Sequence, residues 1–234
     1  MNNNLLEYHI AKGVTAFSTM RTAELPFPVL QSHQVNDDKI AVITSRDTTR
    51  EDLQGIDAMV TNLRNFAIGA RTADCVPILL YDPENKAIAA VHSGWRGTVK
   101  KISQKVIRLM GETYGTRATN LHAIIGPSIG PDSFQVGQDV VDAFQQASFP
   151  IDEIVVKTEI IGTENTIHNA PLVLKSHIDL WKANSLLLEE MGVRPENIQV
   201  AGICTYQHND LFFSARREGK KCGRIINAIL LSEQ

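Results

Sequence analysis

The sequence predicts an α+β fold, in which mixed β-sheets pack with flanking helices in a single compact domain spanning residues 1–234. Strand-like segments outnumber helical ones, and the helical segments do not strictly alternate with them, which disfavours a doubly wound parallel sheet. No internal repeat, low-complexity stretch or linker divides the chain. With 234 residues, 43% of them hydrophobic and 21% charged, the chain can bury a sizeable core.

Predicted strands dominate the first half of the chain. Residues 5–17 alternate weakly between apolar and polar side chains, which predicts a strand or hairpin around Gly13. Two prolines within residues 25–28 disfavour a helix there. Further strands are expected at 29–35, 39–43, 57–61, 76–81 and 87–91.

The second half mixes predicted helices with short strands. Apolar residues at helical spacing predict a helix over 98–114 that ends at Gly115, and another over 137–147. A third helix is expected from an Asn169 cap, with a proline in its first turn, to Gly192. Strands are expected at 121–125, 154–156, 160–161, 198–203 and 211–214.

Composition excludes several classes of partner. The formal net charge is −3 at pH 7, so no strong field attracts nucleic acid or a membrane surface. The amino terminus lacks the features of a signal peptide, and no apolar run approaches the roughly 20 residues of a membrane span. Cys75, Cys204 and Cys222 are odd in number and show no CxxC spacing, which favours a cytoplasmic location over a disulfide framework.

One predicted hairpin carries the strongest functional signal. Two apolar strands joined by an Asp-Pro-Glu-Asn turn predict a buried hairpin over 76–91, which places Cys75 beside His92. The pair alone leaves three interpretations open: a structural pair, a cysteine nucleophile with its histidine base, or two ligands of a metal. Arg71 and Asp74, close before Cys75, favour a functional role because packing does not require charged residues there.

Two further segments are candidates for binding an anion. Residues 126–131 are rich in glycine and proline and can present backbone N–H groups, although no Gly-Lys-Ser/Thr follows as in a P-loop. The basic pair Arg216-Arg217 adjoins a Phe-Phe segment and is either a solvated face or an anion site. Four other titratable residues are expected to be structural: His177, Cys204, Cys222 and His208. For His177, exposure to solvent is the alternative.

The central stretch resembles the signature of the YfiH-like laccase-domain family. The matching motifs are Thr-Ala-Asp-Cys-Val-Pro over 72–77 and Val-His-Ser-Gly-Trp-Arg-Gly over 91–97. Weaker matches extend the resemblance over essentially the whole chain, from Phe-Ser-Thr at 17–19 to Gly-Arg at 223–224. Proteins of this family have been called polyphenol oxidases and, on other evidence, purine nucleoside phosphorylases.

The resemblance implies a metal bound by His33, Cys75 and His92. The residues alone favour a half-exposed strand position without a role for His33, so the third ligand comes from the resemblance. Three nitrogen and sulfur ligands with an open fourth position form the arrangement of a catalytic zinc site. Zinc is therefore the expected cofactor, with copper as the alternative metal.

The chain also departs from the family pattern. The interval before His33 is short and rich in proline, where the family has a longer arginine-containing segment. Gln34 stands where the family has glycine, and Asp-Ser-Phe-Gln at 132–135 replaces the usual Cys-Cys-Tyr-Glu. Ala215 replaces an aromatic residue before the double arginine. These changes affect the expected substrate pocket more than the expected metal ligands.

The first functional hypothesis is an enzyme acting on purine nucleosides, as a monomer or small homo-oligomer. The resemblance implies phosphorolysis of adenosine, inosine, guanosine and methylthioadenosine, together with adenosine deamination. Asp74 and Arg71 are the expected catalytic residues. Phosphorolysis requires cations and N–H donors around phosphate, and five residues are candidates: Arg46, Ser93, Arg96, Gly126 and Ser128.

Two alternative functions use the same residues. A copper-dependent polyphenol oxidase would need several coppers for a true laccase reaction, and the seven histidines include no His-x-His pair. A Cys–His hydrolase would use Cys75 and His92 without a metal. Metal content separates the three functions: zinc favours the phosphorylase, copper the oxidase, and absence of metal the hydrolase.

Overall fold

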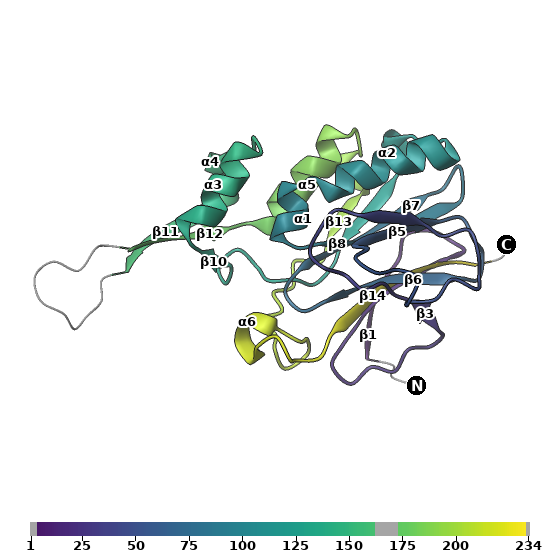
Figure 1. The fold of residues 1–234 in the computed structure, drawn as a ribbon, viewed down its shortest axis with the longest axis horizontal. Helices are drawn as coiled ribbons and strands as arrows, with labels where there is room; N and C mark the ends of the chain where they lie inside the picture. Colours follow the sequence, from purple (N-terminus) through teal and green to yellow (C-terminus); the bar gives the residue numbers. More distant parts are fainter. Residues whose placement is uncertain (1–3, 162–172, 233–234) are drawn as a thin grey trace, which may run out of the picture.

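The structure is a computed structural model that describes residues 4–161 and 173–232. It contains two large sheets and one small sheet (Figure 1). The six-stranded sheet has the order β13-β9-β7-β8-β5-β4, the five-stranded sheet β1-β2-β14-β6-β3, and the three-stranded sheet β10-β12-β11. The six-stranded sheet consists of β4 (Ile40–Val42), β5 (Ala58–Thr61), β7 (Val76–Asp82), β8 (Ala87–Ser93), β9 (His122–Ile125) and β13 (Ile198–Val200).

The five-stranded sheet joins the two ends of the chain, because the last strand lies between the second and the sixth. It consists of β1 (Leu5–Tyr8), β2 (Val14–Thr19), β3 (Val29–Leu30), β6 (Ala67–Thr72) and β14 (Ile225–Leu231). The small sheet consists of β10 (Gln135–Val136), β11 (Val155–Ile161) and β12 (Val173–Ile178). The helices are α1 (Trp95–Val99), α2 (Ile102–Tyr114), α3 (Gln138–Gln146), α4 (Ile151–Ile154), α5 (Leu180–Glu190) and α6 (Ala215–Glu218).

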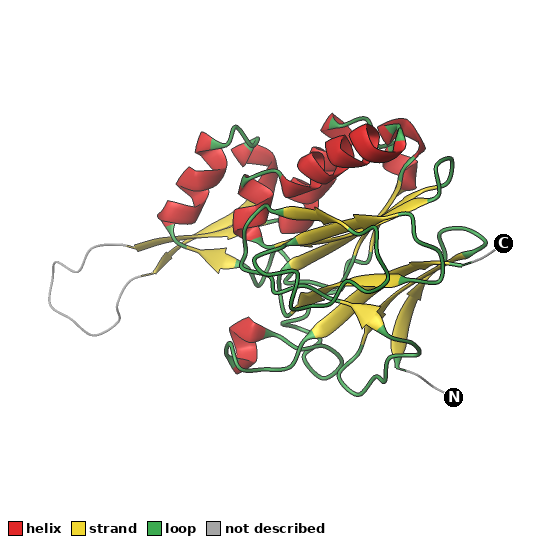
Figure 2. Ribbon diagram, turned by 45° about the vertical axis from the view of Figure 1, so that its right-hand side comes forward, coloured by secondary structure: helices red, strands yellow, loops and turns green. Residues whose placement is uncertain are grey.

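The six-stranded sheet forms the middle layer of the molecule. Figure 2 shows α1, α2 and α5 over one of its faces and the five-stranded sheet against the other. Alternate residues of β7 serve the two sides: Ile78 and Leu80 pack under the helices, whereas Leu79 and Tyr81 pack toward the second sheet. This double coverage explains the uninterrupted apolar sequence of the predicted hairpin.

The predicted α+β class is confirmed, and so are most predicted strands. The segment 5–17 forms the hairpin of β1 and β2, with Gly13 at a φ of 83° in the turn. Segment 29–35 contributes only the two residues of β3, and 154–156 and 160–161 merge into β11. The strand β14 was not predicted, although five of its residues pair with β2 and five with β6.

Three predicted elements differ from the structure. The helix expected over 98–114 is split between α1 and α2, because Lys101 adopts a left-handed φ of 59°. The residues 211–214 form turns before α6, because Phe212 N donates to the His208 carbonyl oxygen at 2.9 Å rather than to a strand. The third predicted helix is corrected next.

That third helix was expected to begin at Asn169, which lies outside the described residues. Residues Val173–Ile178 instead form β12, and the helix begins at Leu180. Asp179 is its N-cap and accepts a hydrogen bond from Lys182 N at 2.9 Å. Apolar residues four apart fit both patterns here, so periodicity alone could not place the boundary. His177, expected on this helix, is a buried strand residue.

A buried polar network couples the middle sheet to the helices. Asn184 of α5 accepts a hydrogen bond from Ser93 Oγ at 2.8 Å and donates to Thr98 Oγ1 at 3.2 Å and to the Leu180 carbonyl at 2.9 Å. All four groups lie inside the protein, where an unpaired polar atom is costly.

We therefore predict that Asn184→Ala lowers the free energy of unfolding by about 2–3 kcal/mol, because Ser93 and Thr98 lose a buried partner. Urea denaturation measures the change. The matched control is Lys182→Ala, an exposed position on the same helix, which should shift the value by less than about 0.5 kcal/mol. Equal stability of Asn184→Ala and the wild type would contradict the role of the network.

Candidate active site

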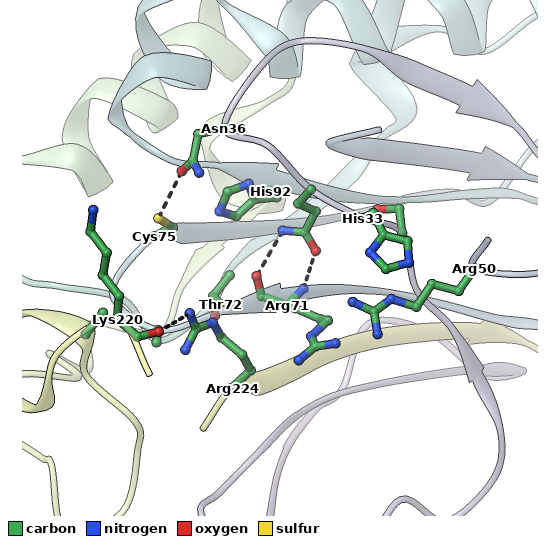
Figure 3. Close-up of a pocket in the computed structure, with 13 residues that line it drawn as sticks. His33, Asn36, Arg50, Arg71, Thr72, Cys75, His92, Lys220 and Arg224 are labelled. Carbon is green, nitrogen blue, oxygen red and sulfur yellow. Dashed lines mark hydrogen bonds between the residues drawn. The ribbon is translucent and has the colours of Figure 1, made fainter. Parts of the chain in front are cut away.

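One cavity collects the residues with the strongest functional signals. Its volume is about 510 Å³, and it lies where the ends of β6, β7 and β8 meet the loop after β3 (Figure 3). Four of the predicted site residues, from different segments of the chain, line it: His33, Arg71, Cys75 and His92. Three cations that the sequence analysis did not select complete the wall: Arg50, Lys220 and Arg224.

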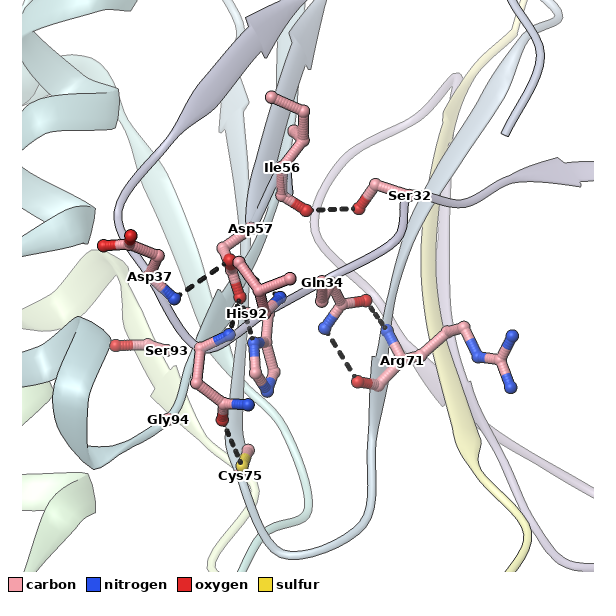
Figure 4. A network of polar contacts seen from close by, with 12 residues as sticks. Ser32, Gln34, Asp37, Ile56, Asp57, Arg71, Cys75, His92, Ser93 and Gly94 are labelled. Carbon is pink, nitrogen blue, oxygen red and sulfur yellow. Dashed lines mark hydrogen bonds and ion pairs between the residues drawn. The ribbon is translucent and has the colours of Figure 1, made fainter. Parts of the chain in front are cut away.

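The buried carboxylate of Asp57 holds this region together. Its Oδ1 atom accepts hydrogen bonds from His92 Nδ1 at 2.7 Å and Asn36 N at 2.9 Å. Its Oδ2 atom accepts from Val35 N at 3.1 Å and Asp37 N at 3.0 Å (Figure 4). The residue is 1% exposed, so these four donors replace the water that a carboxylate requires. Asp57 therefore fixes both the loop after His33 and the His92 ring.

The Cys75–His92 pair follows from the strand register. Val76 lies opposite Ser93 and Pro77 opposite His92, so the predicted hairpin and its pairing are confirmed. Because His92 Nδ1 faces Asp57, its other ring nitrogen is left for the Cys75 side. Burial lowers the pKa of His92, but the adjacent Cys75 thiolate and the Asp57 carboxylate outweigh it and raise the pKa to about 9.

Two neighbours define the surroundings of the Cys75 sulfur. Its thiol lies 3.8 Å from Asn36 Oδ1, on the loop that Asp57 anchors. A Cβ atom at Gly94 would lie 3.2 Å from the sulfur, which is tighter than most Cβ contacts in proteins. Gly94 therefore allows the backbone of the motif at 91–97 to approach the thiol closely.

His33 lines the same cavity but points elsewhere. Its backbone pairs with the segment around Gln54, since His33 N donates to the Leu53 carbonyl at 3.0 Å. Figure 3 shows the ring on the Arg50 side, away from Cys75. In the described part of the chain, no three His, Cys, Asp or Glu side chains are placed to share a metal ion.

The donors nevertheless fit a metal by type and by support. Two imidazoles and a thiolate are the ligands that zinc prefers. The Asp57–His92 contact is the outer carboxylate–histidine bond that orients histidine ligands in metal sites. The three ligand types therefore line one cavity, although the described side chains are not placed to share an ion.

Four cations surround the pair without acidic partners. Among the described lining residues there is no Asp or Glu, and none of the four cations forms an ion pair within the described residues. Burial and the charges of Arg50 and Arg224 lower the pKa of Arg71. The Arg50 Nε atom is buried and has no hydrogen-bond acceptor. This cluster of Arg50, Arg71, Lys220 and Arg224 is therefore suited to bind an anion.

Gln34 connects the anion cluster to the Asp57 loop. Its side-chain amide donates to the Arg71 carbonyl at 2.9 Å and accepts from Arg71 N at 2.8 Å. The strand β3 ends at Leu30, so this amide takes the place of a strand partner for β6 (Figure 4). The departure from the family glycine at this position thus provides a specific backbone contact.

Asp74, an expected catalytic residue, does not line the cavity in this structure. Its carboxylate accepts hydrogen bonds from Thr205 Oγ1 at 2.7 Å and Arg216 N at 2.6 Å. Its φ of 85° lies in the left-handed region, which shapes the turn before Cys75. Asp74 therefore stabilises the backbone around the site, and its hydrogen bond to Arg216 N connects it to the basic pair.

The five predicted phosphate-binding residues also lie outside the described wall of the cavity. Arg46 donates to the carbonyls of Arg64 and Asn65, and the Arg96 guanidinium lies 4.1 Å above the Trp95 ring centroid. These cations are therefore satisfied elsewhere.

The other three candidates serve packing. The Ser93 hydroxyl binds Asn184, and Ser128 Oγ accepts from Trp181 Nε1 at 2.7 Å. A Cβ atom at Gly126 would lie 2.9 Å from Pro77 Cγ, so Gly126 allows two loops to approach.

This architecture defines a class: an α+β domain with a cysteine–histidine pair in a cavity lined by cationic side chains. The chain belongs to the multi-copper polyphenol oxidoreductase laccase family, whose model matches residues 12–232. The expected resemblance is thereby confirmed.

Several relatives support this assignment. A purine nucleoside phosphorylase of Bacteroides thetaiotaomicron is 41% identical over 211 residues, which cover 89% of this chain and 73% of that relative. Adenosine deaminase RL5, from an unknown prokaryotic organism, is 38% identical over 86% of this chain and 74% of its own length. The Bacillus subtilis purine nucleoside phosphorylase YlmD is 31% identical, with coverages of 86% and 69%.

Solved structures share the fold. The Bacillus licheniformis hypothetical protein YfiH superposes with a TM-score of 0.85 at 23% identity, over 98% of this chain and 97% of that one. A Neisseria meningitidis protein superposes with a TM-score of 0.77 at 27% identity, over 98% and 100%. Within the residues described here, no helix has the length and apolarity to span a membrane.

We predict that Asp57→Asn lowers the free energy of unfolding by about 3 kcal/mol, because the new amide donor faces backbone N–H groups and His92 loses its charged partner. Urea denaturation again gives the value. Asp47→Asn, at an exposed position, is the control and should change it by less than about 0.5 kcal/mol. Similar effects of the two substitutions would refute the central position of Asp57.

Proposed function

We propose that this chain catalyses the phosphorolysis of purine nucleosides in the cavity described above. Relatives at 41% and 31% identity carry the name purine nucleoside phosphorylase. The observation that carries the proposal is the pair of guanidinium groups of Arg50 and Arg71, which share a cavity with Cys75 and His92 and have no carboxylate partner among the described residues.

Arg50 and Arg71 provide the phosphate site of this proposal. A guanidinium binds two phosphate oxygens at once, and both groups line a cavity whose described wall contains no carboxylate. Burial, together with the charges of Arg50 and Arg224, lowers the pKa of Arg71, so a bound dianion stabilises the charged guanidinium in addition to forming new hydrogen bonds. Gln34 keeps the Arg71 backbone in place during binding. Phosphate held there can attack the anomeric carbon as the purine leaves.

We further propose zinc as the cofactor, held by His33, Cys75 and His92. Bound zinc would act as a Lewis acid toward an oxygen or nitrogen of the substrate. Asp57 would keep His92 in the tautomer that presents its other nitrogen, which is the supporting observation from this structure. Copper is the alternative metal, and the sequence lacks the His-x-His pairs that a multi-copper oxidase requires.

The proposal includes two related reactions. Adenosine deamination is suggested by the name of the relative that is 38% identical, and it replaces the purine amino group by oxygen in the same pocket. Phosphorolysis of methylthioadenosine needs no further catalytic group, because the reacting bond is the same. Three free cysteines fit the reducing cytoplasm that we assign to the protein.

The phosphate site gives a kinetic prediction. Arg50→Ala and Arg71→Ala should each raise the KM for phosphate about tenfold or more, because each removes charge-assisted hydrogen bonds to the anion. Inosine phosphorolysis with varied phosphate measures this. Arg46→Ala removes a cation that already binds carbonyl groups and should leave the KM for phosphate unchanged. The proposal fails if Arg46→Ala has the larger effect, or if the wild type forms no ribose 1-phosphate.

Metal content gives a second prediction. Protein purified without added metal should contain about one zinc per chain, and Cys75→Ala should reduce this to a small fraction, because the thiolate is the strongest ligand of the set. Elemental analysis measures both. Cys222→Ala is the control, since Cys222 lies outside the described cavity wall. Copper would favour the oxidase, and a metal-free wild type would favour a Cys–His hydrolase, for which Cys75 and His92 line the same cavity.

A further inference from the structure

The cavity carries more positive charge than one phosphate balances. Among the residues that the structure describes, four cationic side chains and no acidic ones line it, on a protein with a net charge of −3. Inorganic phosphate contributes a charge of about −1.5 to −2 at neutral pH. Roughly two positive charges therefore stay unbalanced when phosphate occupies the proposed Arg50–Arg71 site.

The four cations differ in their position along the cavity and in the segment that carries them. Arg50 and Arg71 lie toward His33, whereas Lys220 lies toward Cys75, with Arg224 between Lys220 and Arg71 (Figure 3). Lys220 and Arg224 come from one loop, between α6 and β14, and the other two come from the first third of the chain. The Lys220–Arg224 pair is therefore a separate cationic feature that the phosphate site does not require.

Hydrogen bonds and side-chain packing hold the loop that carries this second pair in place. The Arg224 guanidinium donates to the carbonyl oxygens of Cys222 at 2.6 Å, Gly223 at 2.9 Å and Lys220 at 3.0 Å. A Cβ atom at Gly223 would lie 2.3 Å from the Phe213 ring, so the loop backbone packs directly on that ring. The hydrogen bonds of Arg224 thus stabilise the bend of its own loop, which lies beside the cavity.

We infer that the Lys220–Arg224 pair binds a second anionic group, carried by the nucleoside itself, and that nucleoside 5′-monophosphates are substrates. This inference rests on the proposed phosphorolysis. A phosphomonoester has the same charge as inorganic phosphate, so the two groups together carry about −3 to −4 and balance the four cations. The ribose separates the 5′-phosphate from the reacting anomeric carbon, and Lys220 likewise lies at the opposite end of the cation row from Arg50 (Figure 3).

The reaction balances without any further reactant. An oxygen of inorganic phosphate forms a bond to the anomeric carbon as the bond from that carbon to the purine nitrogen breaks. The electron pair goes to the purine, which takes the proton that phosphate brings. The products are the free purine and ribose 1,5-bisphosphate.

The test compares inosine and inosine 5′-monophosphate as substrates of the same enzyme preparation at fixed phosphate. We expect kcat/KM for the monophosphate to exceed that for inosine about tenfold, because its second phosphate gains charge-assisted contacts. Lys220→Ala should lower the ratio of the two kcat/KM values about tenfold. Lys221→Ala, at the adjacent exposed residue outside the described cavity wall, should leave the ratio unchanged.

Each other outcome has a definite meaning. Cleavage of inosine with a slower reaction of the monophosphate, or a ratio insensitive to Lys220→Ala, overturns this inference and leaves the proposed function intact. No cleavage of either compound overturns both. Faster cleavage of inosine with pyrophosphate than of the monophosphate with phosphate also overturns the inference, because one extended anion would then occupy all four cations.

Discussion

The candidate site depends on one buried carboxylate. Asp57 lies immediately before β5 in the middle of the molecule, and its two oxygens accept four hydrogen bonds, three from one loop and one from His92. A buried carboxylate without such partners would be strongly unfavourable. The folding of the loop and the orientation of the His92 ring are therefore linked, because a change in either removes hydrogen bonds from the buried carboxylate. Through Asn36 the same loop reaches Cys75.

A second constraint connects this centre to the anion cluster. The five-stranded sheet contributes Arg71 at the end of β6, and the six-stranded sheet contributes His92 at the end of β8. The Gln34 amide binds the Arg71 backbone from the loop that Asp57 fixes, so the two sheets present their functional residues to one cavity. A cationic cavity in a protein of net charge −3 is a local concentration of charge, which bulk composition hides.

The sequence predicted the parts of this site that local pattern determines. Two apolar strands joined by a four-residue turn determine the register that places Cys75 beside His92. The family motifs added His33. Asp57 entered the sequence analysis only as the first residue of the expected strand 57–61, because its role depends on a loop twenty residues earlier in the chain. Arg50 and Lys220 carry no local signal, since an arginine or lysine in a loop is usually solvated. Their grouping is a property of the tertiary fold.

The elements and ligands that were predicted wrongly also depend on contacts that the local sequence pattern does not contain. Apolar residues four apart suit both β12 and the start of α5, and only the Asp179 cap marks the boundary. Arg46 and Arg96 were plausible phosphate ligands by composition, but the fold places both outside the described cavity wall, against carbonyl groups and the Trp95 ring. Residue type indicates which chemistry a side chain can perform. Competition among neighbouring partners decides whether the side chain is free to perform it.

The orientation of His92 is the most direct test of this account. Nitrogen-15 NMR of the imidazole, recorded in metal-free protein from below to above its pKa of about 9, reports which ring nitrogen keeps its proton. The account predicts that Nδ1 keeps the proton throughout, in a hydrogen bond to Asp57, and that only the other nitrogen titrates. A neutral His92 that carries its proton on Nε2, with Nδ1 bare, would contradict it.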